Sequence, residues 1–341
     1  MMARDGKDII MNQALRAKCD QLVANDRVIK KAGFLESTNL VKLGSLLYTF
    51  EGATPDVERI KACRKILKGK VGVFSNFRGT LGFIVPVKMS LADDPEAYID
   101  DTMKIYEQLT EGKLFAGEML AMTALAIKDL CPAERSSEVV AKTREAYARM
   151  HKAHPILTNS YDMVLIALMC IMGSDIDATL ANAEALYEEL HARGLSGNAS
   201  QSASMVLALT DAPAEQKVDD FLALYAALKD AKHATPRNGS MAIYAPFVGI
   251  DVPRDTIVSD ISEVDTWLKG QKGYGAMGVG KTVRRLFAAA VTLDTYEGSA
   301  GSAPTTAAAS AVAQTIVEQI VMVVTMIIII SAINAASASS K

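Results

Sequence analysis

A unit of two segments recurs along the chain about every forty residues, and this repeat constrains the fold more than any other feature of the sequence. Each unit has an amphipathic segment that ends in an aromatic residue or a leucine, then a short polar or glycine-containing turn, then a more apolar segment. The segment ends are spaced 38 to 42 residues apart, at Arg64 to Leu67, Tyr106 to Leu109, Tyr147 to Met150, Tyr187 to Leu190, Tyr225 to Leu228, and Trp267 with Leu268. Such spacing predicts about six helical hairpins.

The two segments of a unit differ in where they carry apolar side chains. Between residues 218 and 228, apolar residues recur at helical spacing and form one stripe, while Asp219 and Asp220 lie outside it. This pattern predicts an outer helix with one solvent-exposed face. The run from Met163 to Met172 is apolar at every position, so a helix there must be covered on all sides. Polar capping residues precede these runs, and their Ala, Leu and Met content favours helix over strand.

These patterns predict an all-α fold of repeated α-helical hairpins, about six with a period of about forty residues, that form a curved solenoid or a closed α/α toroid. Residues 1–297 make up this helical-hairpin repeat domain. Within it, residues 1–55 hold one more helical pair, at residues 9–31 and 40–50. This pair is expected to cap the array, because an end unit must present a polar outer face.

The composition changes after Glu297. Residues 298–315 are mostly small, which predicts a flexible linker. Residues 316–336 form an apolar segment, predicted to be a C-terminal helix, whose apolar run is shorter than the roughly 20 residues of a membrane-spanning helix. We expect it to pack in the axial space of a closed ring or at a subunit contact, with a membrane tail anchor and an aggregation-prone strand as the alternatives.

Charge and cysteine usage exclude several classes of protein. The chain has 36 Lys and Arg against 39 Asp and Glu, a formal net charge of −3, so it lacks the basic excess of a nucleic-acid binder. No secretory signal opens the sequence, and the four cysteines are scattered singly, as in proteins with buried, reduced thiols. We therefore expect a cytoplasmic protein; the alternative is the cytoplasmic face of a membrane, reached through a C-terminal anchor.

One string matches a nucleotide-binding motif. Residues 275–282, from Gly275 to Thr282, fit the pattern G-x-x-x-x-G-K-[ST], in which backbone N–H groups cradle phosphates. Such a loop must follow a buried parallel strand, whereas residues 257–268 here read as another outer helix of the repeat. A nucleoside-triphosphatase loop is therefore disfavoured, and a glycine-rich turn between two helices is preferred.

Two histidines are candidate metal ligands. His151 and His154 stand three residues apart, but no Cys, His or carboxylate accompanies them at ligand spacing, so no metal site is predicted. His191 occupies the same repeat position as His151, four residues after a tyrosine. Both suit the end of an outer helix, where a cationic side chain interacts well with the helix dipole.

Parallel inner helices would collect their N-termini on one rim of the array. Helix N-termini offer free N–H groups and partial positive charge, and nearby arginines and lysines would add full charges. This predicts a site for an anionic or polar ligand; ordinary helix capping is the simpler explanation of the same residues. The candidate ligand-binding residues are Arg78, Asn159, Asp162, Asn198, Asn238, Lys281 and Arg285.

Four stretches of the chain resemble the bacterial proteins grouped as domain of unknown function 4003. They are residues 74–79 (Phe-Ser-Asn-Phe-Arg-Gly), residues 157–162 (Leu-Thr-Asn-Ser-Tyr-Asp), the glycine-rich turn at residues 273–281, and the Ala-, Ile- and Ser-rich end. The resemblance covers nearly the whole chain. It implies a cytoplasmic, helical bacterial protein and supplies no catalytic residues to carry over.

The function expected is therefore a non-catalytic binding or scaffold module for a small anionic ligand, a peptide or a protein, because hairpin arrays form large concave surfaces. No cofactor is predicted, and a homo-oligomer is compatible with the sequence. One alternative is an α/α-toroid enzyme in which inner-helix carboxylates such as Glu118 and Asp162 act as acid and base. Another is a membrane-associated adaptor held by the C-terminal segment.

Overall fold

The computed structural model describes residues 11–300, except residues 34, 74, 80, 114–116, 174 and 211. Throughout this part of the chain the regular structure is helical, with thirteen α-helices, four short 3₁₀-helices and no strand. The prediction of an all-α fold is confirmed.

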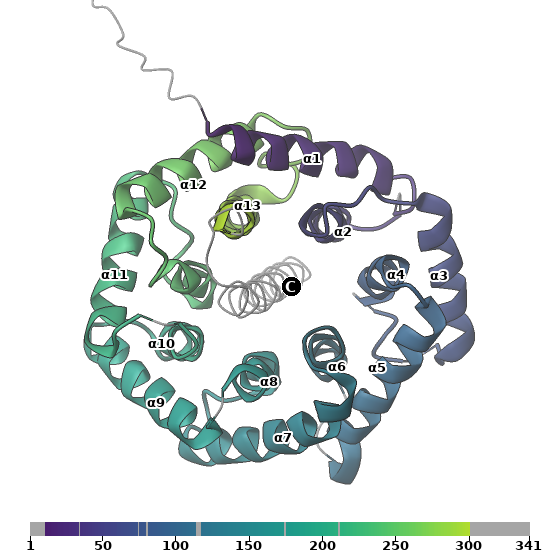
Figure 1. The fold of residues 1–341 in the computed structure, drawn as a ribbon, viewed down its shortest axis with the longest axis horizontal. Coiled ribbons are helices and arrows are strands. Elements are labelled where there is room, and N and C mark those ends of the chain that lie inside the picture. Colours follow the sequence, from purple (N-terminus) through teal and green to yellow (C-terminus); the bar gives the residue numbers. More distant parts are fainter. Residues whose placement is uncertain are drawn as a thin grey trace, which may run out of the picture.

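The helices alternate between an outer and an inner position. Figure 1 shows the outer helices running around the perimeter and the inner helices seen end-on inside them. The outer helices are α1 (Gln13–Ile29), α3 (Val57–Lys70), α5 (Pro95–Thr110), α7 (Ser136–Ala153), α9 (Ile176–Ala192), α11 (Ala214–Asp230) and α12 (Arg254–Lys269). The inner helices are α2 (Thr38–Phe50), α4 (Leu81–Leu91), α6 (Glu118–Leu130), α8 (Met163–Met172), α10 (Gly197–Leu207), η4 (Gly239–Phe247) and α13 (Gly280–Ala300).

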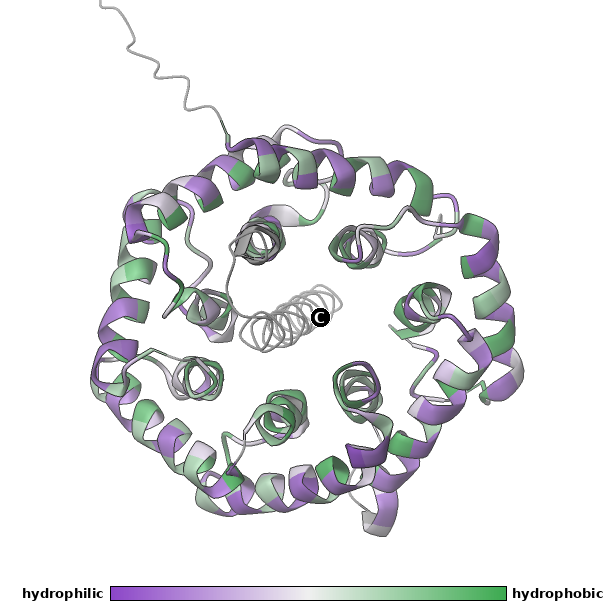
Figure 2. Cartoon of the chain, in the orientation of Figure 1, coloured by the Kyte–Doolittle hydropathy of each residue, from purple (hydrophilic) through white to green (hydrophobic). Residues whose placement is uncertain are grey.

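Burial follows the apolar pattern of each helix. In α8 every residue from Met163 to Ile171 is buried, whereas the outer helix α3 buries only Ile60, Cys63 and Leu67. Figure 2 shows the same contrast, with polar and apolar residues alternating along the outer helices and mostly apolar residues on inner helices such as α8. The apolar faces of two layers thus form one core between them.

Three of the seven outer helices are capped by an aspartate, which satisfies unpaired N–H groups of the first turn. Asp56, Asp94 and Asp175 each accept hydrogen bonds from two backbone N–H groups of α3, α5 and α9, at 2.9 to 3.2 Å. Among the inner helices, Ser37 and Asn238 cap α2 and η4 in the same way. These caps fix where each unit of the repeat begins.

The first helical pair packs against the last one. Helix α1 contacts both α12 and α13, and α13 contacts α2. Lys18 Nζ lies 2.7 Å from the Asp294 carboxylate of α13, in a partly buried position. The pair expected to cap an open end of the array therefore sits beside the seventh and last pair, as Figure 1 shows for α1, α12 and α13.

The starts of neighbouring inner helices meet. The Leu81 N–H of α4 donates to Glu118 Oε1 of α6 at 3.1 Å, and Gly239 of η4 packs against Ser202 in α10. Gly273, just before α13, packs against Lys42 of α2. The loops that lead from each outer helix into the next inner helix thus share one rim. We call their described residues the entry rim: residues 30–33, 35–37, 71–73, 75–79, 111–113, 117, 154–162, 193–196, 231–238 and 270–279.

Two elements differ from the sequence prediction. The apolar run after Asn238 forms the 3₁₀-helix η4 rather than an α-helix, and Pro246 within it has no N–H to donate. Helix α13 continues through residues 298–300, the first residues of the predicted linker. The rest of that linker and the predicted C-terminal helix at residues 316–336 lie outside the described residues.

Candidate functional site

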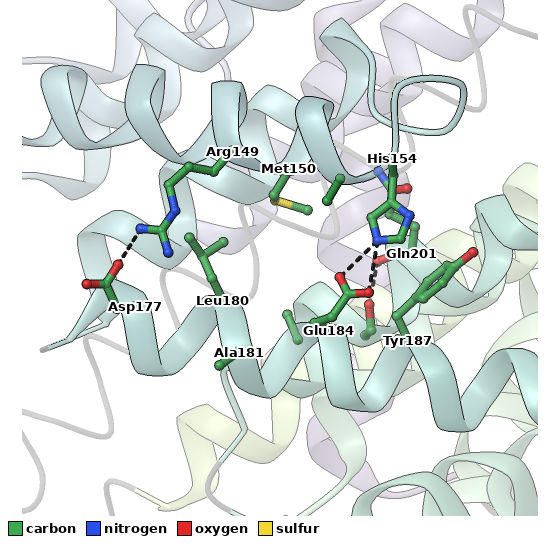
Figure 3. Close-up of a pocket in the computed structure, with 12 residues that line it drawn as sticks. Arg149, Met150, His154, Asp177, Leu180, Ala181, Glu184, Tyr187 and Gln201 are labelled. Carbon is green, nitrogen blue, oxygen red and sulfur yellow. Dashed lines mark hydrogen bonds and ion pairs between the residues drawn. The ribbon is translucent and has the colours of Figure 1, made fainter.

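A pocket of about 270 Å³ lies between the outer helices α7 and α9, with α10 beneath it. Arg149, Met150 and Ala153 come from α7, Leu180 and Glu184 from α9, and the floor is made by two residues of α10, Gln201 and Ser204. Figure 3 shows the two outer helices running side by side with these side chains between them. The pocket thus opens at a junction between two units of the repeat.

Two polar pairs bridge the mouth of the pocket. Arg149 of α7 pairs with Asp177 near the start of α9, and His154 Nε2 lies 2.9 Å from both oxygens of Glu184. Figure 3 shows one pair at each end of the groove, with the aliphatic Leu180 between them. Both pairs are partly exposed, so they contribute little to stability but set the charge pattern at the mouth.

The pocket floor holds a buried amide. Gln201 is only 4% exposed, and within the described residues neither its oxygen nor its nitrogen makes a hydrogen bond of standard geometry. A buried amide without strong partners is costly, which makes Gln201 the least satisfied group of the pocket. Ser204, its neighbour on the floor, donates instead to the Gln201 backbone carbonyl at 3.0 Å.

Gln201 also faces a carboxyl group with a shifted pKa. Burial raises the pKa of Asp162 to about 6, while the Asn159 N–H and the Gln201 side chain oppose the rise. The Asn159 N–H donates to Asp162 Oδ2 at 2.8 Å. Asp162 therefore changes its protonation state near neutral pH, unlike an ordinary exposed aspartate.

The aromatic side of the pocket repeats in the neighbouring unit. Tyr187 stacks on His191 at 5.8 Å between ring centroids, and Tyr147 stacks on His151 at the same distance. Each of these histidines bonds through Nδ1 to a backbone carbonyl beyond the helix, at 2.9 to 3.0 Å. The two histidines occupy equivalent positions of the repeat and close the ends of α7 and α9.

The predicted ligand residues spread along the entry rim. Asn159 and Asp162 lie together before α8, and Asp162 reaches the pocket floor through Gln201. Asn198 is exposed in the first turn of α10, which lies next to η4, and Asn238 caps η4 by accepting from the Ser240 N–H at 3.0 Å. These residues are neighbours along the rim and do not converge on one pocket among the described residues.

The predicted cations have two kinds of surroundings. Arg78 donates to the carbonyls of Lys68 and Val71, at 2.7 and 2.9 Å, and so closes the end of α3. Arg285 is buried and donates to the carbonyls of Lys232 and Ala234. Lys281, in contrast, is exposed at the start of α13. Only Lys281 of the three therefore presents its charge to solvent.

The two carboxylates considered for catalysis are engaged in separate places. Glu118 accepts the N–H of Leu81 across the junction between α4 and α6. Asp162 is held by the Asn159 N–H of its own loop, and Gln201 of α10 lies next to it. Each thus stabilises a helix start rather than facing the other across a cleft.

The motif at residues 275–282 forms a closed turn between α12 and α13. The N–H groups of Gly278 and Gly280 donate to the Gly275 carbonyl at 3.0 and 3.2 Å, and the Val279 N–H donates to the Gly273 carbonyl at 3.0 Å. In a phosphate-binding loop these N–H groups would point at the phosphates. The loop also follows helix α12 rather than a strand, so the helix-to-helix turn is the better description.

Neither the histidines nor the cysteines assemble a reactive centre in the described part of the chain. No three His, Cys, Asp or Glu side chains gather there at metal-binding distances. All four cysteines are buried, and burial raises the pKa of each thiol, to about 12 for Cys19 and about 11 for Cys170. Such thiols are protonated and poorly nucleophilic at neutral pH.

Sequence reasoning missed two buried charged clusters, one in the last helical pairs and one in the first pair. Asp265 of α12 accepts from Arg284 Nε at 2.5 Å and lies 2.7 Å from His233 Nδ1, joining α12, α13 and the loop before η4. Asp26 of α1 pairs with Lys42 of α2 at 2.5 Å. Their members are 16 to 32 residues apart in the chain, so no local motif reveals them.

A comparison with known protein families finds one that matches most of the chain. A family model described as "Protein of unknown function (DUF4003)" matches residues 27–334. The chain belongs to the DUF4003 family. The resemblance inferred from the sequence is thereby confirmed, and the match extends from α1 to beyond α13. Comparison with curated proteins and with solved structures found no match.

The DUF4003 description names no activity, so any function must be argued from the geometry of this chain. Within the described residues, no helix is both long enough and apolar enough to span a membrane.

Proposed function

We propose that this DUF4003 protein is a non-catalytic binding module whose ligand occupies the pocket between α7, α9 and α10. The observation that carries the proposal is the buried Gln201 amide on the pocket floor: its polar neighbour is the Asp162 carboxyl, and neither of its polar atoms makes a well-formed hydrogen bond within the described residues. Groups of this kind are expected to be satisfied by something, because leaving them unpaired costs free energy. A ligand that reaches the floor would supply the missing partners.

The chemistry of the pocket indicates the ligand class. A glutamine side chain offers one acceptor oxygen and a two-hydrogen donor, which pair well with a peptide group, a primary amide or a carboxylate. Around it, Met150, Leu180 and Tyr187 offer apolar contact, while Arg149 and His154 stand at the mouth. We therefore favour a short peptide segment or a small polar molecule carrying an amide or carboxylate, with Asn159 and Asp162 next to the site.

The rest of the chain would act as the scaffold of this site. We propose that the helical pairs form a closed α/α toroid, since α1 packs on α12 and α13, and that this ring holds α7, α9 and α10 at fixed spacing. A ring of this kind needs no conformational change to present a preformed pocket. We also propose that the protein is cytoplasmic. We further propose that Asn198, Asn238 and Lys281 bind ligand elsewhere, on the entry rim or in the helix turns next to it.

The test is a thermal-shift screen of capped dipeptides, amino-acid amides and small carboxylates, followed by titration of the hits. Gln201→Leu keeps the side-chain volume and removes both polar atoms, so we expect it to fold and to lose at least about tenfold in affinity, the equivalent of one good hydrogen-bonded pair. Gln216→Leu, at an exposed position of α11, is the matched control and should bind as the parent does. Equal binding by both variants would remove the pocket from consideration.

One observation favours a second function. The buried Asp162, with a pKa of about 6, has the properties of a general acid or base working near neutral pH. An enzyme would need a second group facing it, and Glu118 is already hydrogen-bonded to Leu81. Turnover of any hit from the ligand screen, abolished by Asp162→Asn, would replace the binding function with catalysis.

A further inference from the structure

Exposed apolar side chains concentrate on one rim of the molecule. Among the described residues, the large apolar side chains that stand out as exposed are Leu35 at 82%, Val73 at 71%, Ile156 at 93% and Met277 at 105%. Each lies in a different loop of the entry rim, before α2, α4, α8 and α13 respectively. A single exposed apolar residue needs no explanation, but four on the same rim call for one.

Each of these apolar residues has an exposed lysine close by in the chain. Lys31 precedes Leu35, Lys68 precedes Val73, Lys152 precedes Ile156, and Lys272 and Lys281 flank Met277, all four or five residues away. Further exposed lysines on this rim or in the helix turn leading to it are Lys30, Lys229, Lys232 and Lys269. None of these lysines forms an ion pair within the described residues.

The opposite rim has neither property. It consists of the loops that lead from inner helices back to outer ones, at the described residues 51–56, 92–94, 131–135, 173, 175, 208–210, 212–213 and 248–253. Its exposed charged residues are Glu51, Asp56, Asp93, Asp94, Glu134, Asp175 and Asp251, with Arg135 as the cation. None of the four exposed large apolar residues lies there.

Helix capping explains part of this asymmetry. Acidic residues at helix starts and basic residues at helix ends are favoured by the helix dipole. Capping does not explain Leu35, Val73, Ile156 and Met277, which lie between helices and leave most of their surface in water. An isolated apolar side chain beside a lysine is the pattern of loops that rest on the boundary between lipid head groups and acyl chains.

We propose that the entry rim docks on an anionic lipid bilayer surface. The lysines would contact lipid phosphate and carboxylate groups, and the four apolar side chains would enter the head-group region. The starts of neighbouring inner helices contact one another, and Figure 1 shows the inner helices end-on and therefore roughly parallel. The four loops thus lie on the same side of the molecule and can face one surface together. The net charge of −3 does not oppose this, because on the entry rim and in the helix turns leading to it the exposed lysines outnumber the exposed acidic residues, which are Glu107, Glu111 and Asp230.

A second copy of the chain fits this rim less well. The acidic rim of another ring would match the lysines, but it offers no exposed large apolar side chain among the described residues to meet Leu35 or Ile156. A bilayer supplies both the negative charge and the apolar layer. The proposal is independent of the ligand pocket, which opens between α7 and α9 and includes none of the four apolar residues.

The experiment is co-sedimentation of the full chain with vesicles of phosphatidylcholine alone or with about 30% phosphatidylserine, the anionic lipid of cytoplasmic leaflets. We expect at least about tenfold stronger binding to the anionic vesicles, weakened by added salt. The variant carries Leu35→Ser, Val73→Ser, Ile156→Ser and Met277→Ser, and should bind at least about tenfold more weakly, since apolar burial drives insertion. Because all four side chains are exposed, its circular dichroism and melting temperature should match the parent's.

A charge variant and its control separate lipid binding from other effects. Lys31→Gln with Lys272→Gln, both on the entry rim, should lower binding to anionic vesicles, whereas Lys104→Gln with Lys142→Gln, on the outer helices α5 and α7, should not. Residues 301–341 are present in every variant, so they cannot cause a difference between them. Unchanged binding by the serine variant, equal binding to both vesicle types, or self-association of the parent without lipid binding would each overturn the proposal.

Discussion

The Arg16 guanidinium of α1 lies over the indole ring of Trp267 in α12, with 5.1 Å between its central carbon and the ring centroid. The contact joins the first outer helix to the last, and Trp267 is the sole tryptophan of the chain. Tryptophan fluorescence therefore reports on the seam where the two ends of the helical array meet. A guanidinium over an indole is a favourable cation–π pair that adds modestly to apolar packing.

We expect urea unfolding followed by Trp267 fluorescence to coincide with unfolding followed by circular dichroism, because the closed toroid that we propose would have no free end to unfold first. Arg16→Ala should lower the free energy of unfolding by about 0.5 to 1 kcal/mol, and so lower the urea midpoint slightly, without separating the two curves. A fluorescence transition at clearly lower urea than the helix transition would show that the seam opens alone, as in an open solenoid.

Asp265 is expected to be a major contributor to stability. Burial raises the pKa of its carboxyl, but His233 and Arg284 lower it more, so the net pKa lies below the ordinary value. Asp265→Asn leaves the buried Arg284 without its counter-charge and should lower the free energy of unfolding by about 3 to 5 kcal/mol. Asp219→Asn, which breaks an exposed pair with Arg193, is the control and should cost less than about 1 kcal/mol.

The same carboxyl predicts a loss of stability in acid. Because the folded pKa of Asp265 is lower than the unfolded one, its contribution is complete above pH 3.8 and is lost as the pH falls through the folded value. Chemical denaturation between pH 3 and pH 7 should show the parent losing stability over this range more steeply than Asp265→Asn. Parallel curves would contradict the assignment.

Asp162 predicts the opposite dependence on pH. Its folded pKa of about 6 is higher than the ordinary 3.8, so its protonated form stabilises the fold in acid and this contribution is lost as the pH rises through about 6. Asp162→Asn keeps the neutral form at every pH. Relative to the parent, it should gain up to about 3 kcal/mol in stability between pH 4 and pH 7.5, at about 1.4 kcal/mol for each pKa unit.

The control for this measurement is Asp220→Asn, at an exposed position of α11. Its side chain forms no ion pair among the described residues, so the substitution should change the free energy of unfolding by less than about 0.5 kcal/mol. If Asp162→Asn behaves like this control, the carboxyl is ionised in the folded protein throughout the range.

The glycine-rich turn predicts a sharp difference between two similar substitutions. A Cβ at Gly278 would collide with the Gly273 carbonyl, whereas a Cβ at Gly275 would meet no atom within 4 Å. Gly278→Ala should therefore lower the free energy of unfolding by at least about 2 kcal/mol, and Gly275→Ala by less than about 0.5 kcal/mol. Thermal melts check both, and equal melting temperatures would mean that residues 273–280 do not form this turn.

The helical class and the inner and outer positions follow from local patterns. A helix that is apolar on every face must be packed on every side, and in α8 all residues from Met163 to Ile171 are buried. The spacing of His151 after Tyr147 and of His191 after Tyr187 predicts equivalent positions for the two histidines. In the structure each histidine stacks on its tyrosine. Periodicity is readable because neighbouring residues on one helix face share the same surroundings.

The pocket could not be predicted because its parts come from different units. His154 meets Glu184 thirty residues later, and Gln201 reaches the floor from α10. In the sequence, Gln201 is one polar residue in a small-residue helix, and nothing in its neighbours marks it as buried. The 3₁₀ form of η4 was missed for a similar reason, since the effect of Pro246 on so short a helix depends on its packing.

The polarity of the two rims has an electrical consequence. The positive ends of the inner-helix dipoles lie on the rim that carries the lysines, and the negative ends lie on the rim that carries the aspartates. Side chains and backbone thus add to a dipole moment along the direction of the inner helices. In the field of a charged object the molecule should turn before it makes contact, so that orientation is set during approach and the first collisions already occur with the correct face forward.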